Sequence, residues 1–572
     1  MITTYSLKQQ AANWLQPLTE LPAEQVISML EVPPSSELGD LAFPCFVLAK
    51  SWRRAPQQIA AELSEQLGTA ASPYATAAAT GGYINLSWNR QHYAPLLLNA
   101  IALPDYEQLQ PEQKQRIIID MSSPNIAKPF GVGHLRSTVI GAALYRIYAA
   151  AGHEPISVNH IGDWGTQFGK QIVAHLRWSD PEQAAADPIG EALRVYIKFH
   201  QEAETMPELE DEARDWFRRL EQGDEEALEL WRYFVKVSME KLNGIYERLG
   251  VQFDEVLGES FYNDKMPAVV EQLKTLGLLE ESQGAQVVRL DELELPPCLI
   301  LKSDGTTIYP TRDLATAIYR RQVMVGDQLV YVVGGEQTLH FRQVFAVLRK
   351  MGYEWADHCN HVAFGLMRIN GKKMSTRKGK VVLLEQLMDE AVARAAQIIA
   401  EKNPALPQRQ QVAEQIGIGA IIFSDLKNAR QNEIDFSLEE ALSFEGETGP
   451  YVQYAHARIC SILSKAEGFV DDPTVAHNAP MPEMWSDAAW ELLGHLGSYR
   501  EALARAVQLQ EPSVMARYAL QTARLFNQWY SRDRIVDADP RVKADRLALA
   551  KWTGHTLERT LKLLGMAAPQ QM

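Results

Sequence analysis

The chain has few cysteines and no excess of positive charge. Four cysteines, Cys45, Cys298, Cys359 and Cys460, are scattered through 572 residues, and no two form a Cys-x-x-Cys pair. This pattern argues against a disulfide framework and against a structural zinc site, and it suits a reducing cytosol. The formal net charge is −16. Taken alone, this charge argues against a nucleic-acid partner, because neutralising phosphates requires lysine and arginine. A large RNA would have to bind local basic patches.

Long hydrophobic runs, internal repeats and low-complexity segments are also missing. No apolar stretch is long enough to span a bilayer, and the chain does not open with a charged segment followed by an apolar core. We therefore expect no membrane segment and a cytoplasmic location. Hydrophobic residues make up 46% and charged residues 22% of the chain, which is typical of a folded globular protein. The length allows three or four domains.

The most informative stretch runs from Asp120 to Thr138. The β-branched residues 117–119 before it predict a buried parallel strand, and apolar residues at helical spacing from His134 predict a helix. Gly131 and Gly133 lie in the loop between them. A strand, a glycine-containing loop and a helix place a phosphate chain against backbone N–H groups. From the Gly-x-Gly spacing alone, an ordinary turn between strand and helix is an equally good interpretation.

Two later segments carry further candidates for a polar site. The apolar run at 298–301, followed by Asp304-Gly305, predicts a hairpin that delivers Tyr309 and Asp313 to the start of a helix. Asp313 could simply cap that helix. A glycine-containing loop within 367–382 concentrates lysine and arginine in an otherwise acidic chain. Such a loop suits a polyphosphate whose leaving group gains charge, although a solvated basic loop is the alternative.

Several strings in the sequence resemble one enzyme family. The string Ser123-Pro-Asn-Ile-Ala-Lys-Pro-Phe-x-x-Gly-His-Leu-Arg-Ser-Thr138 is similar to the ATP-binding signature of class I aminoacyl-tRNA synthetases, in the version of arginyl-tRNA synthetases. Ile161-Gly-Asp-Trp-Gly-Thr-Gln-Phe-Gly169 also matches this family, and Lys373-Met-Ser375 resembles its second signature, Lys-Met-Ser-Lys-Ser. There are two departures. Gly131 replaces the first histidine of His-x-Gly-His, and Thr376-Arg377 replaces the final Lys-Ser.

The resemblance implies a set of residues that act on ATP. His134, Lys373 and Lys128 would be catalytic and bear on the phosphates. The remaining ATP-binding candidates are Pro129, Gly131, Gly133, Met374, Ser375 and Lys378. ATP would be a substrate accompanied by Mg²⁺, with no tightly bound cofactor and no dedicated protein metal site.

The resemblance also implies an arginine-binding site. Its candidate residues are Asp120, Ser123, Asn125, His134, Tyr309, Asp313 and Gln337. The chemistry is suitable, because a carboxylate pairs with a planar, forked guanidinium through two N–H···O bonds and a tyrosine face adds cation–π attraction. From the residues alone, Asn125 could instead form a local turn with its own backbone.

The C-terminal part resembles the anticodon-binding domain of the same family. Aromatic side chains and arginines share short helical stretches there, a combination that reads single-stranded RNA loops. The candidate tRNA contacts are Tyr451, Tyr454, Arg458, Trp529 and Arg532. An aromatic stripe at helical spacing is more often part of a core, so we expect some of these rings to be buried.

The predicted fold class is α/β. We expect a Rossmann-like class I synthetase catalytic core with a helical insertion, an α+β N-terminal module and an all-α C-terminal anticodon-binding domain. The predicted domains are an additional tRNA-contacting domain at 1–105, a catalytic domain at 106–385 with its insertion at about 178–285, a helical connector at 386–435 and the anticodon-binding domain at 436–572.

The predicted function is ATP-dependent ligation of L-arginine to the 3′ end of its tRNA through arginyl-adenylate, with release of AMP and pyrophosphate. The partners would be tRNA(Arg), L-arginine and ATP, and the chain would be a monomer. Two alternatives remain open at this point. One is a catalytically weakened or silent tRNA-binding relative, suggested by Gly131 and Thr376; the other is an enzyme that passes arginyl-adenylate to an acceptor other than tRNA.

Overall fold

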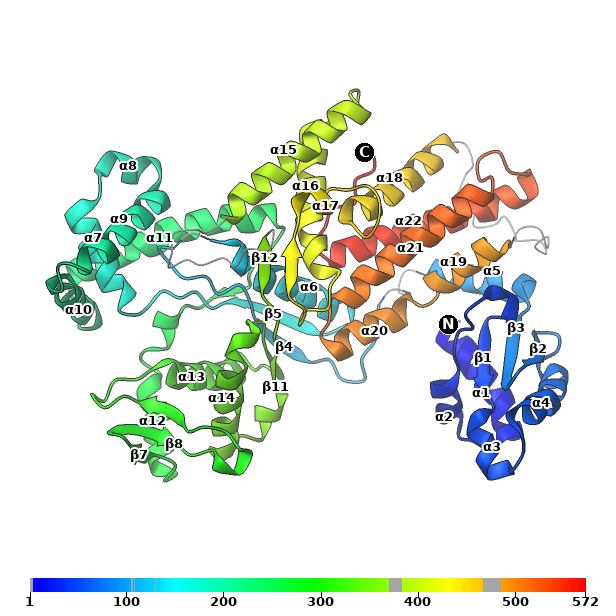
Figure 1. Ribbon diagram of the computed structural model, residues 1–572, viewed down its shortest axis with the longest axis horizontal. Helices are drawn as coiled ribbons and strands as arrows, with labels where there is room; N and C mark the ends of the chain where they lie inside the picture. Colours follow the sequence, from blue (N-terminus) through cyan, green and yellow to red (C-terminus); the bar gives the residue numbers. More distant parts are fainter. Residues whose placement is uncertain (1–3, 104–105, 107, 129, 370–382, 467–484) are drawn as a thin grey trace.

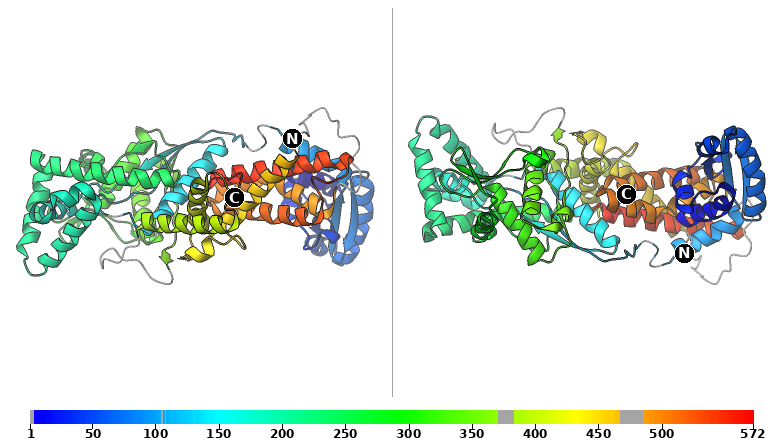
Figure 2. Two further views of the ribbon diagram at one scale, coloured as in Figure 1. Left: turned by 90° about the horizontal axis from the view of Figure 1, so that it is seen from above. Right: turned by 90° about the horizontal axis from the view of Figure 1, so that it is seen from below.

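A computed structural model describes residues 4–103, 106, 108–128, 130–369, 383–466 and 485–572. The molecule is elongated, with the N-terminal module at one end of the long axis and helices α7–α10 at the other (Figures 1 and 2). A parallel sheet lies between these ends, and the C-terminal helices lie between the sheet and the N-terminal module. No helix in the described part of the chain has the length and apolar composition needed to cross a membrane.

The N-terminal module packs helices on a three-stranded antiparallel sheet with the order β1-β3-β2. Buried apolar residues recur along α4 at helical spacing (Ile59, Leu63, Leu67), and this helix packs on β2 and β3. The elements are α1 (Thr4–Thr19), α2 (Ala23–Met29), the 3₁₀ turn η1 (Ser36–Leu38), β1 (Leu41–Pro44), α3 (Phe46–Trp52), α4 (Pro56–Ala71), β2 (Ala75–Thr80), β3 (Tyr83–Trp88) and α5 (Arg90–Ile101).

The central sheet is parallel, with the strand order β11-β10-β4-β5-β6. Ile117 and Ile119 point into one core and Ile118 into another, so β4 is buried on both faces, as its β-branched sequence predicts. The strands are β4 (Arg116–Asp120), β5 (Glu154–Asn159), β6 (Glu255–Val256), β10 (Gln328–Tyr331) and β11 (Cys359–His361).

Helices surround this sheet, and a small antiparallel sheet, β7-β8-β9, packs beside it. The predicted second hairpin strand after Asp304 does not form. Leu301 and Thr307 share one isolated bridge, and the chain then enters a helix at Tyr309. The helices are α6 (Leu135–Ala150), α7 (Gln167–Trp178), α8 (Pro181–Ala186), α9 (Pro188–Ala203), α10 (Glu208–Glu221), α11 (Glu225–Arg248), α12 (Met266–Thr275), α13 (Tyr309–Gln322) and α14 (Thr338–Lys350). The short turns and strands are η2 (Val132–His134), η3 (Glu259–Tyr262), β7 (Glu280–Ser282), β8 (Ala285–Val288), η4 (Asp291–Leu293), β9 (Cys298–Leu301), η5 (Gly335–Gln337) and η6 (Glu354–His358).

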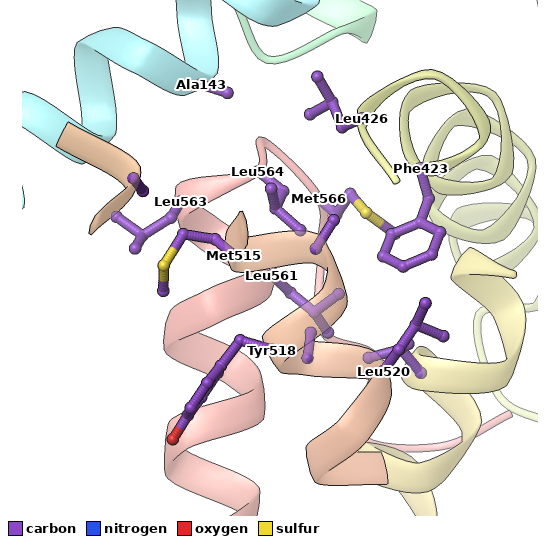
Figure 3. Close-up of a cluster of buried hydrophobic side chains, with 14 of the residues drawn as sticks. Ala143, Phe423, Leu426, Met515, Tyr518, Leu520, Leu561, Leu563, Leu564 and Met566 are labelled. Atoms are coloured by element: carbon purple, nitrogen blue, oxygen red, sulfur yellow. The ribbon is translucent and has the colours of Figure 1, made fainter. Parts of the chain in front are cut away.

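The C-terminal part is almost entirely helical. Its elements are β12 (Met367–Ile369), α15 (Leu384–Lys402), α16 (Arg409–Leu426), β13 (Ile434–Phe436), α17 (Leu438–Ala441), α18 (Gly449–Lys465), α19 (Asp487–Leu496), α20 (Tyr499–Leu509), α21 (Ser513–Arg532) and α22 (Pro540–Leu563). Figure 3 shows that one buried cluster joins Ala143 of α6 to Phe423 of α16, Met515 of α21 and Leu561 of α22. The helix that follows the Gly131–Gly133 loop is therefore part of the same core as the C-terminal helices.

The packing of α6 on the end of β4 depends on a glycine. A Cβ at Gly141 would lie 2.3 Å from the Cβ of Met121. We predict that G141A lowers the free energy of unfolding by about 1–3 kcal/mol through overpacking. Gly244 on α11 is the matched control, because no atom beyond its own stretch of helix backbone lies within 4 Å of its Cβ position. G244A should be stabilising by about 0.5–1 kcal/mol through helix propensity.

Calorimetry of thermal unfolding measures the change in stability of both variants. A G141A variant that unfolds at the temperature of the unmutated chain would contradict this close packing of α6.

Candidate active site

The carboxyl ends of the central strands meet at one edge of the parallel sheet. Asp120, the last residue of β4, lies opposite Tyr331, the last residue of β10. These two strands are neighbours although the chain passes through β5 and β6 between them, so the strand order reverses at this pair. Crevices beside such a reversal are where open α/β sheets bind ligands. The candidates that follow β4 and β10 in the sequence therefore share one edge.

The loop after β4 has an unusual backbone. Ser122, Ser123 and Ala127 have φ angles of 73°, 49° and 58°, in the left-handed region that non-glycine residues rarely adopt. The hydroxyl of Ser137 on α6 accepts a hydrogen bond from the Ser122 N–H at 2.9 Å and donates to the carbonyl of Val332 at 2.6 Å. One serine thus joins the loops after β4 and β10. Strained backbone that is held by several contacts clusters at functional sites.

His134 lies at the end of η2, where α6 begins. Its ring stacks on Phe130 with the ring centroids 5.0 Å apart. Burial lowers the pKa of the His134 imidazole, and the positive charge of Lys128 lowers it further, against a backbone hydrogen bond to Gly131. The ring is therefore neutral at pH 7. Its Nδ1 is buried and has no hydrogen-bond partner among the described residues.

The other described residues of the predicted ATP site lie close to His134. The Nζ of Lys128 donates to the Oε1 of Gln167 at 2.9 Å. Gly133 is exposed, with no atom within 4 Å of its Cβ position, so space is open beside it. Gly131 is buried with a φ of −87°, a conformation open to any residue. The backbone itself therefore does not require glycine at position 131.

Five predicted ATP-site residues lie outside the described residues: Pro129, Lys373, Met374, Ser375 and Lys378. The described chain resumes at Leu383, which forms an antiparallel bridge with Gly131. The N–H of Leu384 donates to the carbonyl of Phe130 at 3.0 Å. The described chain after the basic loop therefore returns directly to the loop after β4.

Tyr309 and Asp313 lie one turn apart near the start of α13. Tyr309 is 67% exposed. The Oδ2 of Asp313 lies 2.5 Å from the Nε2 of His340, near the start of α14. Gln337 is exposed in η5, in the loop that follows β10. The predicted residues from the segments around 309 and 337 thus reach the same region through α13 and α14.

Asp120 uses both of its carboxylate oxygens within the protein. Its Oδ2 lies 2.8 Å from the Nη1 of Arg320, and its Oδ1 accepts the hydroxyl of Ser123 at 2.8 Å. In this structure Asp120 orients Ser123 and neutralises Arg320 rather than presenting a free carboxylate. Asn125 is exposed, and its backbone bridges to Gly162 in the string at 161–169. Asp120 at the end of β4 and Ser123 and Asn125 on the strained loop therefore lie close together.

Glu259 belongs to the same region and was missed by the sequence analysis, which placed it in the helical insertion without a role. It lies in η3, directly after β6, and its Oε2 is 3.3 Å from the Nη1 of Arg312. Burial raises the pKa of the Glu259 carboxyl to about 7; Arg312 opposes this, and Asp313 and Asp163 add to it. A carboxylate just after a short parallel strand was the signal available in the sequence.

Carboxylates and guanidinium groups are interleaved at this edge. Burial is the main cause of the lowered pKa of the His160 imidazole. The charges of Asp120 and Asp313 raise this pKa, and those of Arg320 and Arg312 lower it. The pairs Asp120–Arg320 and Glu259–Arg312 show that the carboxylates here already bind guanidinium groups of the chain. An arrangement of this kind suits a ligand that carries the same cation.

The candidate RNA contacts on α18 form an exposed polar and aromatic patch with α21. The guanidinium of Arg458 lies over the ring of Tyr454, 4.7 Å from its centroid, and 5.7 Å from that of Tyr530. Asn527 bonds both the Nη1 of Arg458, at 2.8 Å, and the hydroxyl of Tyr451, at 3.1 Å. Tyr454 and Tyr530 are exposed, so stacking surface is available beside a cation.

The sequence prediction that Trp529 contacts RNA is corrected by its burial. Trp529 is 0% exposed and packs near Phe526 in the core of the helical part. The helical period turns position 529 inward and position 530 outward, so the exposed ring at this turn is Tyr530. Arg532 is exposed at the end of α21.

Family models match three successive ranges of the chain. Residues 97–438 match "tRNA synthetases class I (R), catalytic domain", residues 452–572 match "DALR anticodon binding domain", and residues 6–87 match "Arginyl tRNA synthetase N terminal domain".

Similar proteins span nearly the whole chain. The Arginine–tRNA ligase of Latilactobacillus sakei is 49% identical over 96% of this chain and 97% of its own length. That of Streptococcus equi is 48% identical over 98% of this chain and 99% of its own length. The solved structure of Thermus thermophilus arginyl-tRNA synthetase superposes with a TM-score of 0.81 at 28% identity, covering 99% of both chains. The chain therefore belongs to the arginine–tRNA ligases, within the class I aminoacyl-tRNA synthetases.

Proposed function

We propose that the sheet edge beside the strained loop is where this chain joins arginine to ATP. The chain is an arginine–tRNA ligase, with L-arginine, ATP and tRNA(Arg) as substrates. The arginine carboxylate attacks the α-phosphate of ATP, forming arginyl-adenylate and expelling pyrophosphate. A ribose hydroxyl at the 3′ end of the tRNA then attacks the carbonyl carbon and expels AMP. The observation that carries the location is the meeting of the loops after β4 and β10 at one sheet edge, with the strained loop, His134 and the carboxylate of Asp120 on the β4 side.

We assign the guanidinium of the substrate to Asp313, Tyr309, Gln337 and Glu259. The charge of Asp313 adds to the raised pKa of Glu259, so a substrate cation close to both carboxylates, in addition to Arg312, would relieve this repulsion. Tyr309 is exposed one helical turn from Asp313 and can cover a planar cation with its ring. We place Ser123 and Asn125 at the amino-acid end of the substrate, with Asp120 as the anchor of Ser123.

We assign the phosphates of ATP to His134, Lys128, Lys373 and the backbone around Gly131 and Gly133. We place the imidazole of His134 beside a phosphate oxygen at the start of α6. Pro129, Met374, Ser375 and Lys378 complete the proposed ATP site. Cationic donors that bind most strongly as charge develops on pyrophosphate lower the barrier. Bringing the two substrates together supplies much of the remaining acceleration.

Mg²⁺ is proposed to enter with ATP. No group of three or more His, Cys, Asp or Glu side chains in the described ranges is placed to hold a metal ion. A magnesium ion that accompanies a nucleotide is usually coordinated mainly by phosphate oxygens and water. The ion would neutralise phosphate charge while His134 and the lysines orient the chain of phosphates.

We propose that the patch of Tyr451, Tyr454, Arg458 and Tyr530, with Arg532 at the end of α21, contacts the anticodon region of tRNA. The exposed rings and the stacked guanidinium of Arg458 support this. The domain division 1–105, 106–385, 386–435 and 436–572, with an insertion at about 178–285, is retained as a proposal. The matched ranges 6–87, 97–438 and 452–572 support its first and last domains, and the range 97–438 includes both the proposed catalytic domain and the connector.

A monomeric state and a cytoplasmic location also remain proposals. Four cysteines that are all unpaired support a reducing compartment, and sedimentation velocity tests the monomer. The two alternative functions, a silent relative and a different acceptor, are not favoured, because relatives that match over nearly the whole chain are named Arginine–tRNA ligase.

Arginine-dependent ATP–pyrophosphate exchange and charging of tRNA test the proposed site. We predict that D313N lowers kcat/KM for arginine about 10²-fold, because a hydrogen-bonded charge pair contributes about 1.5–3 kcal/mol. The control is D304N, since Asp304 lies in an exposed turn and bonds only Thr306 among the partners described. Activity of D313N equal to that of D304N would contradict the assignment, as would charging of the tRNA with lysine in place of arginine.

The pH dependence of arginine binding tests Glu259. Arginine stays protonated throughout, whereas the Glu259 carboxyl, with its pKa of about 7, gains most of its negative charge as the pH rises from 6 to 8. We therefore predict that KM for arginine falls between pH 6 and pH 8. E259Q should remove this dependence and raise KM at pH 8 about 10-fold. The control is E255Q, because Glu255 is exposed on β6; a KM that is flat with pH in the unmutated chain would refute the assignment.

A further inference from the structure

A short segment between β11 and β12 connects three parts of the molecule. Residues 363–366, here called the strap, pair with the loop after β10. Phe364 forms a parallel bridge with Gly334, and the N–H of Gly335 donates to the carbonyl of Phe364 at 2.9 Å. This loop continues through η5 to Gln337. The position of the strap therefore helps to set the position of a proposed arginine-binding residue.

Arg136 connects the strap to α6. Its Nη1 donates to the carbonyl of Gly365 at 2.6 Å and to that of Asn432 at 2.8 Å, and its Nε lies 3.0 Å from the Oδ2 of Asp425. The side chains of Arg136 and Asp425 are each 1% exposed. A buried charge pair of this kind is costly to break, because the remaining partner keeps an uncompensated charge. Arg136 follows His134 closely on α6.

Arg430 connects the strap to the C-terminal helices. Its Nη1 donates to the carbonyl of Ala363 at 2.7 Å, and its own carbonyl accepts the N–H of Gly365 at 2.9 Å. On the other side, the Nε of Arg430 donates to the carbonyl of Gln510 at 3.1 Å, and its N–H donates to the Oε2 of Glu511 at 3.1 Å. Gln510 and Glu511 lie between α20 and α21.

The strap has no room to shift toward the connector. A Cβ at Gly365 would lie 2.5 Å from the carbonyl oxygen of Asn432, so the two backbones are already in close contact. The residues that hold the strap lie on or next to helices α6, α16 and α21. These helices share one buried cluster, which includes Ala143 of α6, Phe423 and Leu426 of α16 and Met515 of α21 (Figure 3). The strap is thus clamped between the helical part and the loop after β10.

We propose that Arg136 and Arg430 are positioning residues, which act through the strap to hold the loop carrying Gln337 in the geometry that binds arginine. The proposal rests on the proposed function of this edge. Neither arginine is among the residues proposed to bind the substrate. Their role follows from the planar guanidinium, whose Nε and Nη1 bind separate partners in fixed directions, whereas the single nitrogen of a lysine cannot reproduce both bonds. In Arg136 these partners are Asp425 and the strap carbonyl of Gly365, and in Arg430 they are the carbonyls of Gln510 and Ala363.

The test compares R136K and R430Q with the control R248Q. Arg248 bonds Glu414 on α16, the helix that also carries Asp425, and it bonds Asp389 on α15. It has no described contact with the strap. We expect R136K and R430Q each to raise KM for arginine roughly 5- to 10-fold in ATP–pyrophosphate exchange, as substitutions along a coupling path do. R248Q should leave KM unchanged. A smaller folded fraction lowers the apparent kcat without changing KM, so the KM readout separates positioning from stability.

A double variant tests whether both arginines act through one element. In R136K/R430Q the rise in KM should be well below the product of the two single effects, because both substitutions release the same strap. A full product would overturn the shared mechanism. If R136K does not fold, R430Q and E511Q carry the test, since Glu511 accepts the N–H of Arg430.

An unchanged KM in R430Q would overturn the proposal whatever R136K does. An unmutated chain without any arginine-dependent exchange would refute the proposed function instead, so the two failures can be told apart.

Discussion

The parallel pairing of β4 with β10 is the constraint on which the rest of the site depends. This pairing sets Asp120 opposite Tyr331 and brings two loops, far apart in the sequence, to one edge. The Ser137 hydroxyl can then bond both loops at once, and the strap can pair with the loop after β10. Without this strand order the loop that carries Ser123 and the loop that carries Gln337 would not meet.

The edge concentrates features that ordinarily oppose folding. Three non-glycine residues of one loop adopt left-handed backbone, and two arginines are buried nearly completely with single carboxylate partners. Such features cost free energy, and the packing around them has to offset that cost. The large shared core of α6 with the C-terminal helices is where this structure supplies that packing.

Two kinds of contact therefore link the catalytic part to the helical part. Apolar packing joins α6 to α16, α21 and α22, and polar contacts from Arg136 and Arg430 meet at the strap. Apolar contacts fix the relative position of the two parts only approximately, because these contacts are not directional. Hydrogen bonds to specific carbonyls fix the remaining freedom of the strap, because they depend on direction as well as distance.

The sequence predicted much of the local structure. The three isoleucines before Asp120 predicted β4, and the apolar spacing after His134 predicted α6, because burial on two faces and helical period leave distinct patterns. The hairpin after Asp304 failed, because a turn signal does not report whether the next residues find a partner strand or enter a helix. Trp529 failed because a mixed aromatic and basic stretch does not say which rings face inward.

By itself, the sequence determined the family, the fold class and the residue types available for binding arginine and ATP, because motif strings and periodicity are local properties of the chain. Only the tertiary structure decided that Asp120 is already paired with Arg320 and that the charge of Asp313 acts on the Glu259 carboxyl. It also decided that Arg136 and Arg430 both bind the strap. Each of these facts depends on contacts between residues far apart in the sequence, and no local pattern encodes which distant side chain a residue will contact.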